Sequence, residues 1–187
     1  QWVHFGAGNI FRAFPAALQQ KLLNEGIEKT GIIVAEGYDY EIIKKAYRPQ
    51  DDLSLLVTLK ANGTIEKTVI GSLAESLTVD RHDADDWGRL KEIFARDTLQ
   101  MVSFTITEKG YSITSPDGAF RADVKADFEA GPENADSYIG KLAALCYWRY
   151  TNGAAPLALV SMDNCSHNGD KLFAAVDAYA KAWTENG

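Results

Sequence analysis

The sequence has few cysteines and lacks a long apolar run. Only Cys146 and Cys165 occur among its 187 residues, without a CxxC pair or a spacing of His and Cys that suits zinc. We therefore expect no disulfide framework and no metal site, and we expect reduced thiols in a cytoplasmic protein. No apolar run approaches the roughly 20 residues that a membrane span requires. No secretory signal is recognisable, and since Gln1 falls within a strand-like run, we expect native residues before it.

A basic surface is also missing. The formal net charge is −7 and the pI is near 5.0, and no cluster of Lys and Arg interrupts this acidic balance. Such a chain repels a phosphate backbone, so nucleic acid is not an expected partner. With 46% hydrophobic residues, the chain is long enough for one well-packed domain.

Apolar periodicity predicts alternating strands and helices. Residues 2–5 form a short β-type run that enters a glycine turn, a helix follows until Gly26, and Gly31–Ala35 has the uniformly apolar character of a buried parallel strand. This order is typical of an α/β, doubly wound, mostly parallel Rossmann-type sheet. The same criterion predicts strands over 99–106 and 157–160 and helices over 40–47, 83–94, 137–150 and 169–183, the last with an apolar stripe that includes Phe173. Asp83 is placed to cap the second of these helices.

Two segments depart from this alternation. Leu53–Lys60 and Ile65–Ile70 are β-like runs on either side of Asn62-Gly63. Asn-Gly tolerates positive φ, so we predict an antiparallel hairpin inserted at about residues 53–72. Residues 118–134 are polar and lack periodicity, which predicts a loop.

The first glycine turn is a candidate phosphate site. Gly6 and Gly8 follow a strand and precede a helix, whose N-terminal N–H groups attract a pyrophosphate. An ordinary strand-to-helix turn is the alternative, because two glycines alone are a weak signal and Phe11 replaces the third. Arg12 could supply a cation or could be a solvated side chain. The candidate cofactor-binding residues of this segment are Gly6, Ala7, Gly8, Asn9, Ile10 and Arg12.

A carboxylate follows the second predicted strand. Glu36 stands where an acidic side chain can bind the adenosine ribose and repel a 2′-phosphate, which favours NAD. Its interval from Gly8 is longer than the usual one, so Asp39 is a rival for the same role.

Polar residues also follow two later strands. Ligands bind at the carboxyl edge of open α/β sheets, and both 105–111 and Ser161–Gly169 are rich in hydrogen-bonding groups. A lone loop histidine is more often structural than catalytic, so a structural role is favoured for His167. From the first of these segments we take Thr105, Thr107, Glu108 and Lys109 as candidate cofactor-binding residues.

Together, three segments of the sequence resemble the mannitol dehydrogenase family of polyol dehydrogenases, which includes fructuronate and tagaturonate reductases. They are His4–Phe14, Thr107–Tyr111 and Ser161–Gly169. The resemblance implies an N-terminal Rossmann domain for NAD(P) and a helical second domain with a Lys general base. It also implies that Asn164 is the catalytic residue that this domain contributes, as a donor to the substrate oxygen.

The Lys motif of that family is absent here, so we expect one domain of a longer protein, inactive alone, whose partners are its own C-terminal domain and a small sugar. Phe11, where the mannitol 1-phosphate branch tends to have Gly, favours an unphosphorylated hexitol or a uronate. The predicted function is NAD-dependent hydride transfer between a sugar alcohol or aldonate and its keto form. A non-catalytic dinucleotide sensor and a methyltransferase are the alternatives.

Overall fold

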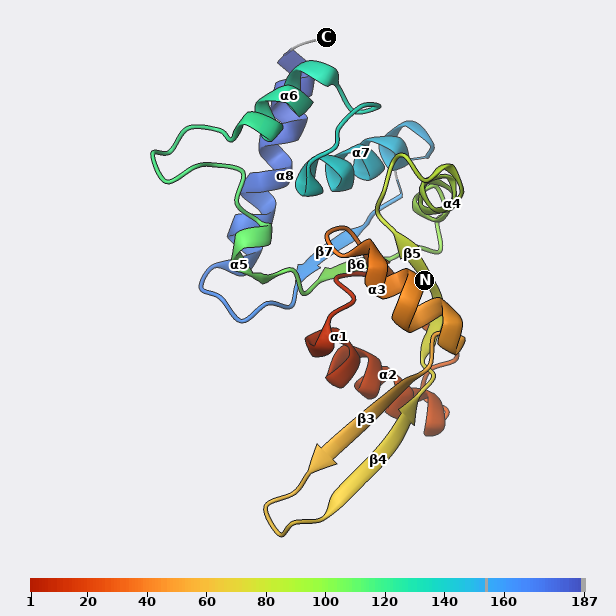
Figure 1. The fold of residues 1–187 in the computed structure, drawn as a ribbon. Coiled ribbons are helices and arrows are strands. Elements are labelled where there is room, and N and C mark those ends of the chain that lie inside the picture. Colours follow the sequence, from red (N-terminus) through yellow and green to blue (C-terminus); the bar gives the residue numbers. More distant parts are fainter. Residues whose placement is uncertain (154, 186–187) are drawn as a thin grey trace.

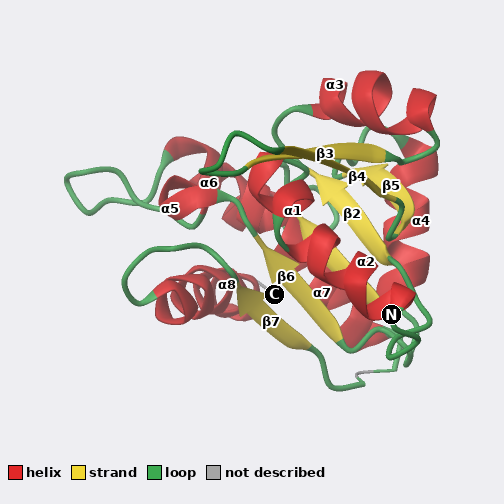
Figure 2. Ribbon diagram, turned by 90° about the horizontal axis from the view of Figure 1, so that it is seen from below, coloured by secondary structure: helices red, strands yellow, loops and turns green. Residues whose placement is uncertain are grey.

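The computed structural model describes residues 1–153 and 155–185. Within them, a parallel sheet of five strands has the order β5-β2-β1-β6-β7 (Figures 1 and 2). The predicted doubly wound fold is confirmed. The strands are β1 (Trp2–Phe5), β2 (Ile32–Glu36), β5 (Leu73–Thr78), β6 (Met101–Phe104) and β7 (Ala158–Ser161).

Helices cover both faces of the sheet. Successive strand residues point to opposite faces, so Ile32 and Val34 join one apolar core while Ile33 and Ala35 join the other. The first core packs under α1 (Asn9–Ala13), α2 (Pro15–Asn24) and a π-helical turn, η1 (Ile43–Tyr47). The second packs under α4 (Ala84–Phe94), α7 (Tyr138–Thr151) and α8 (Asn168–Glu185).

Local sequence signals set several helix ends. The helix predicted after the glycine turn is broken at Phe14, because Pro15 begins α2 and has no N–H to continue α1. As predicted, Asp83 caps α4, accepting a hydrogen bond from the Asp86 N–H at 3.2 Å. Ser137 caps α7 through the Gly140 N–H in the same way.

The predicted hairpin is present, as β3 (Ser54–Leu59) paired antiparallel with β4 (Ile65–Ile70). It projects away from the sheet beside α1 and α2 (Figure 1). Before it, the predicted helix over 40–47 is a short α3 (Tyr40–Ile42) that continues into η1 and a 3₁₀ turn, η2 (Arg48–Gln50).

Two sequence predictions were wrong, and one strand was missed. Residues 118–134 contain α6 (Ala122–Ala130), which depends on tertiary bonds: Asp127 accepts from the backbone N–H groups of Asp136 and Ser137 at 2.8 and 3.0 Å. β5 was missed because its Glu75 interrupts the apolar pattern, and this side chain pairs with Arg89. Phe173 was placed on the apolar stripe of α8 but is 70% exposed, while Ala175 and Tyr179 are buried instead.

A buried arginine attaches the β7 edge of the sheet. The Arg149 side chain, on α7, is buried and donates hydrogen bonds to five backbone carbonyl groups. They belong to Phe94, Arg96, Leu99, Ala155 and Pro156. These bonds connect the segment between α4 and β6 with the segment that enters β7.

Two features are absent from the part of the chain that the structure describes. None of its helices has the length and apolarity that crossing a membrane requires. No group of three or more His, Cys, Asp or Glu side chains there could hold a metal ion.

Candidate functional site

The glycine turn after β1 is held by its neighbours on both sides. Gly6 donates to the Ala35 carbonyl at 2.9 Å, and Thr105 donates to the Phe5 carbonyl at 3.0 Å. Gly6 has φ +110°, and a Cβ there would lie 2.4 Å from the Thr105 carbonyl oxygen. Gly8 differs, since a Cβ on it would meet nothing within 4 Å. Gly6 is therefore required by the fold, whereas Gly8 leaves open space beside the backbone.

Glu36 closes the same turn from the end of β2. Its Oε2 accepts from the Ala7 N–H at 2.8 Å, and its Oε1 accepts from the N–H groups of Tyr38 and Asp39 at 2.8 and 3.3 Å. The Ala7 carbonyl accepts from the Tyr47 hydroxyl at 2.7 Å. Both backbone groups of Ala7 are thus used within the protein, and this residue shapes the turn.

A cavity of about 460 Å³ opens at the carboxyl edge of the sheet. It brings together the glycine turn, the end of β2 and the segment after β6, as expected for a ligand site in an open α/β fold. Its lining residues are Gly6, Gly8, Glu36, Tyr38, Thr105, Ile106, Thr107, Lys109, Gly110 and Arg121.

Six predicted cofactor-binding residues line this cavity: Gly6, Gly8, Glu36, Thr105, Thr107 and Lys109. Of the others, Asp39 and Ile10 are exposed side chains outside the lining. Glu108 forms an ion pair with Lys171 of α8. The hydrogen bond that Lys171 donates in this pair lowers the pKa of the Glu108 carboxyl group.

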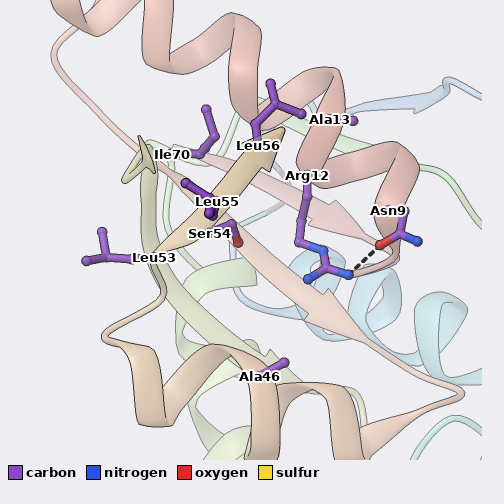
Figure 3. A pocket seen from close by; sticks show the side chains of 9 residues that line it. All are labelled: Asn9, Arg12, Ala13, Ala46, Leu53, Ser54, Leu55, Leu56 and Ile70. Carbon is purple, nitrogen blue, oxygen red and sulfur yellow. Dashed lines mark hydrogen bonds between the residues drawn. The ribbon is translucent and has the colours of Figure 1, made fainter. Parts of the chain in front are cut away.

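Arg12 and Asn9 face a different space. The Arg12 Nη2 donates to Asn9 Oδ1 at 2.6 Å, and the guanidinium lies 5.8 Å from the centre of the Tyr47 ring. Both residues line a cavity of about 350 Å³ between α1, η1 and the base of the hairpin, and the Arg12 side chain points into it (Figure 3). The predicted pyrophosphate cation is therefore turned toward the hairpin.

Asp163 joins the two polar segments at the edge of the sheet. Its Oδ2 accepts from the Ile106 N–H at 2.9 Å and from the Tyr111 hydroxyl at 2.5 Å, and its Oδ1 accepts from the Thr107 N–H at 3.0 Å. Burial, followed by the bond to Asp163, raises the pKa of Tyr111. Thr107 has a positive φ of 65°, so this carboxylate holds a backbone that a β-branched residue rarely adopts.

Asn164 follows Asp163 in the loop after β7 and is exposed. It lies outside the lining of the 460 Å³ cavity but is next in sequence to the carboxylate that holds Thr107. His167 is 80% exposed, and its Nδ1 lies 3.2 Å from Asp170 Oδ2.

His4 lies under the glycine turn, fully buried on β1. Its ring nitrogens are 2.7 Å from Ser103 Oγ and 2.8 Å from Thr105 Oγ1, and its ring stacks on Phe11. Burial lowers the pKa of His4 to about 3, so the ring is neutral at physiological pH. His4 thus positions Thr105, a lining residue, without carrying charge.

Sequence reasoning missed four lining residues and Asp163. Tyr38, Ile106 and Gly110 adjoin predicted positions, and a wider window around each motif would have included them. Arg121 comes from the segment between α5 (Thr107–Gly110) and α6, and no motif marks it. Asp163 was within a recognised polar segment, but only the fold reveals that it faces Ile106 and Thr107.

Comparisons with known proteins identify the family of the chain. The sequence model of the mannitol dehydrogenase Rossmann domain matches residues 1–186. The chain is 48% identical, over its full length, to the D-mannonate oxidoreductase of Thermotoga maritima, covering 34% of that protein. It is 33% identical, over 96% of its length, to the polyol:NADP oxidoreductase of Gluconobacter oxydans, covering 37% of that protein.

A solved structure extends the likeness to the fold. The ternary complex of Pseudomonas fluorescens mannitol 2-dehydrogenase with NAD and D-mannitol superposes with a TM-score of 0.81 at 28% identity. The match covers 98% of this chain and 37% of the other. The chain spans about a third of the length of the curated relatives named above. It belongs to the mannitol dehydrogenase family and corresponds to the Rossmann domain of that family.

Proposed function

We propose that this chain is the NAD-binding domain of a longer dehydrogenase that transfers hydride between a sugar alcohol or aldonate and its keto form. The observation that carries the proposal is the cavity at the carboxyl edge of the sheet, where the glycine turn and Glu36 meet the segment after β6. Mannitol and mannonate both remain within the proposed substrate class, since relatives of both kinds match.

The cavity residues fit a dinucleotide. Open space beside Gly8 lets a pyrophosphate approach the backbone. Glu36 lines the cavity with both oxygens held by backbone N–H groups, so its negative charge is fixed where it would meet a ribose diol and repel a 2′-phosphate. Thr105, Thr107 and Lys109 would hold the remainder of the cofactor. When bound, the nicotinamide supplies the hydride acceptor or donor.

In this proposal the residues of this chain orient the reactants, and one of them, Asn164, stabilises the negative charge that develops on the substrate. Asp163 fixes the backbone of Thr107 on one side of the sheet edge, and the next residue, Asn164, would donate to the substrate oxygen as negative charge grows there. The general base and the residues that select the substrate would come from the remainder of the longer polypeptide. The isolated chain should therefore bind cofactor without measurable turnover, because general-base help alone is worth about a hundredfold to ten-thousandfold. A cytoplasmic location remains a prediction.

Calorimetric titration of the purified chain with NADH, NADPH and S-adenosylmethionine tests the proposal. We expect NADH to bind and to bind more tightly than NADPH. Equal affinity for the two dinucleotides would remove the role assigned to Glu36. Binding of S-adenosylmethionine alone would replace the dehydrogenase proposal with the methyltransferase alternative.

A further inference from the structure

The outer face of the hairpin is apolar and exposed. Residues directly opposite in an antiparallel pair share a face, and the pairs are Leu55 with Val69, Val57 with Lys67, and Leu59 with Ile65. The five apolar side chains of this face are between 47% and 75% exposed. We call the six residues Leu55, Val57, Leu59, Ile65, Lys67 and Val69 the outer hairpin face.

A hairpin whose outer face contacts only water would be expected to carry polar side chains on that face, whereas this one carries apolar side chains there. The opposite face of the hairpin carries Leu56 and Ile70, which pack in the domain core, with Thr68 opposite Leu56 and the pair of Thr58 and Glu66 further out. An isolated two-stranded hairpin is marginally stable in water, and a contiguous exposed apolar surface marks an interaction site. The polar residues of the distal hairpin therefore face water, and the outer hairpin face is the side suited to contact.

Lys67 indicates the charge of the contact. It stands between the two apolar pairs, and its side chain forms no ion pair or hydrogen bond within residues 1–153 and 155–185, whereas the side chain of Lys60 in the same hairpin pairs with Glu66. Arg12, near the hairpin base, has no carboxylate partner in that part of the chain either, and its Nε is buried without an acceptor. A surface that covers this side should be apolar with carboxylate groups.

We infer that the outer hairpin face is the docking surface for a segment of the same polypeptide that follows residue 187 in the longer protein and carries apolar residues and a carboxylate facing Lys67. This inference rests on the proposed function, which places the chain in a longer enzyme. The chain covers only 34% and 37% of two curated relatives, so about two-thirds of such a protein is available as the occupant. A second copy is less suitable, because an isologous contact centred on this face would oppose Lys67 to its own symmetry mate.

Thiol labelling of the full-length protein tests the inference. Val57→Cys and Thr58→Cys place a thiol at adjacent positions on opposite faces of β3, and peptide mass spectrometry after maleimide treatment separates them from Cys146 and Cys165. We expect the thiol of Val57→Cys to react at least tenfold more slowly than that of Thr58→Cys, at the same ratio over a tenfold range of protein concentration. Equal rates would overturn the inference, and protection that disappears on dilution would overturn it in favour of a second copy.

A charge reversal examines the carboxylate. Lys67→Glu should lower the melting temperature of the full-length protein more than Lys29→Glu, which makes the same charge change at an exposed position. Equal shifts would refute the part played by Lys67. NADH titration of the Val57→Cys variant keeps the two proposals apart, because cofactor binding could fail while the hairpin is protected, or persist while it is not.

Discussion

Phe11 stacks on His4 with ring centroids 4.4 Å apart and planes 16° apart. In a dinucleotide fingerprint the position of Phe11 usually belongs to a third glycine, which lets the first helix approach the sheet. Here an aromatic pair occupies that contact, and His4 reaches on to Thr105 at the cavity wall. The helix is therefore held against β1 by ring packing, and the packing extends to a residue of the proposed cofactor site.

The two glycines of the turn should respond differently to substitution. Gly8→Val should fold normally and weaken NADH binding at least tenfold, because its side chain would enter the cavity and hold the pyrophosphate off the backbone. Gly6→Ala should instead destabilise the chain by about 2 to 4 kcal/mol, through positive φ and collision with the Thr105 carbonyl oxygen. Thermal unfolding and calorimetry on both variants measure this contrast. An unchanged NADH dissociation constant for Gly8→Val would show that the pyrophosphate does not bind beside Gly8.

Glu36→Ala should reduce the preference for NADH over NADPH and weaken NADH binding about tenfold, the worth of one hydrogen bond to a charged group. Asp39→Ala is the matched control, because Asp39 is exposed and does not line the cavity. Calorimetry with both dinucleotides gives the four constants needed. If Asp39→Ala lost the preference for NADH over NADPH and Glu36→Ala kept it, the role at the ribose would belong to Asp39 and not to Glu36.

His4 should make stability depend on pH. Its pKa is about 3 in the folded protein, against 6.5 ordinarily. Between about pH 3 and pH 6.5, His4 is therefore protonated in the unfolded chain but not in the folded chain. The stability from this residue is fully present above pH 6.5 and is lost as pH falls toward 3, at about 1.4 kcal/mol per pH unit. Urea unfolding of the wild type and His4→Gln between pH 7 and 4.5 measures it, and parallel pH profiles for the two proteins would contradict the assignment.

Asp163→Asn should destabilise the chain by about 1 to 3 kcal/mol, because an amide nitrogen cannot accept from the N–H groups that face the carboxylate. Asp170→Asn removes a carboxylate from the first turn of α8, but Asp170 is 85% exposed, and its one ion pair within the described residues is with His167. Its effect should stay below about 0.5 kcal/mol. Denaturant unfolding compares the two; equal losses would mean that Asp163 does not hold the sheet edge.

Asn164→Ala in the full-length enzyme should lower kcat about a hundredfold with little change in NADH affinity, since an oxyanion donor acts mainly in the transition state. Steady-state kinetics with mannitol and mannonate, together with NADH titration, separate these effects. An unaltered kcat would remove Asn164 from the mechanism.

The features of the fold that were predicted correctly were those whose signal is local. Gly6 and Glu36 lie at the ends of apolar strands, so periodicity and turn chemistry located both. Asp83 was recognised as a helix cap for the same reason. The direction of the Arg12 side chain depends on η1 and the hairpin, and α6 depends on Asp127 meeting Asp136 and Ser137. These contacts form only in the folded chain, and no periodicity encodes them.

Arg149 couples the stability of two segments that lie far apart in the sequence. Residues 94–99 and 155–156 are separated by more than fifty positions in the sequence. The guanidinium group of Arg149, on α7, nevertheless donates hydrogen bonds to backbone carbonyl groups of both segments. The edge strand β7, which leads directly to Asp163 and Asn164, therefore depends on α7 and on the end of α4 for its attachment. Loss of these bonds should therefore release β7 and α7 together, and native-state hydrogen exchange would detect the two elements opening as a single unit.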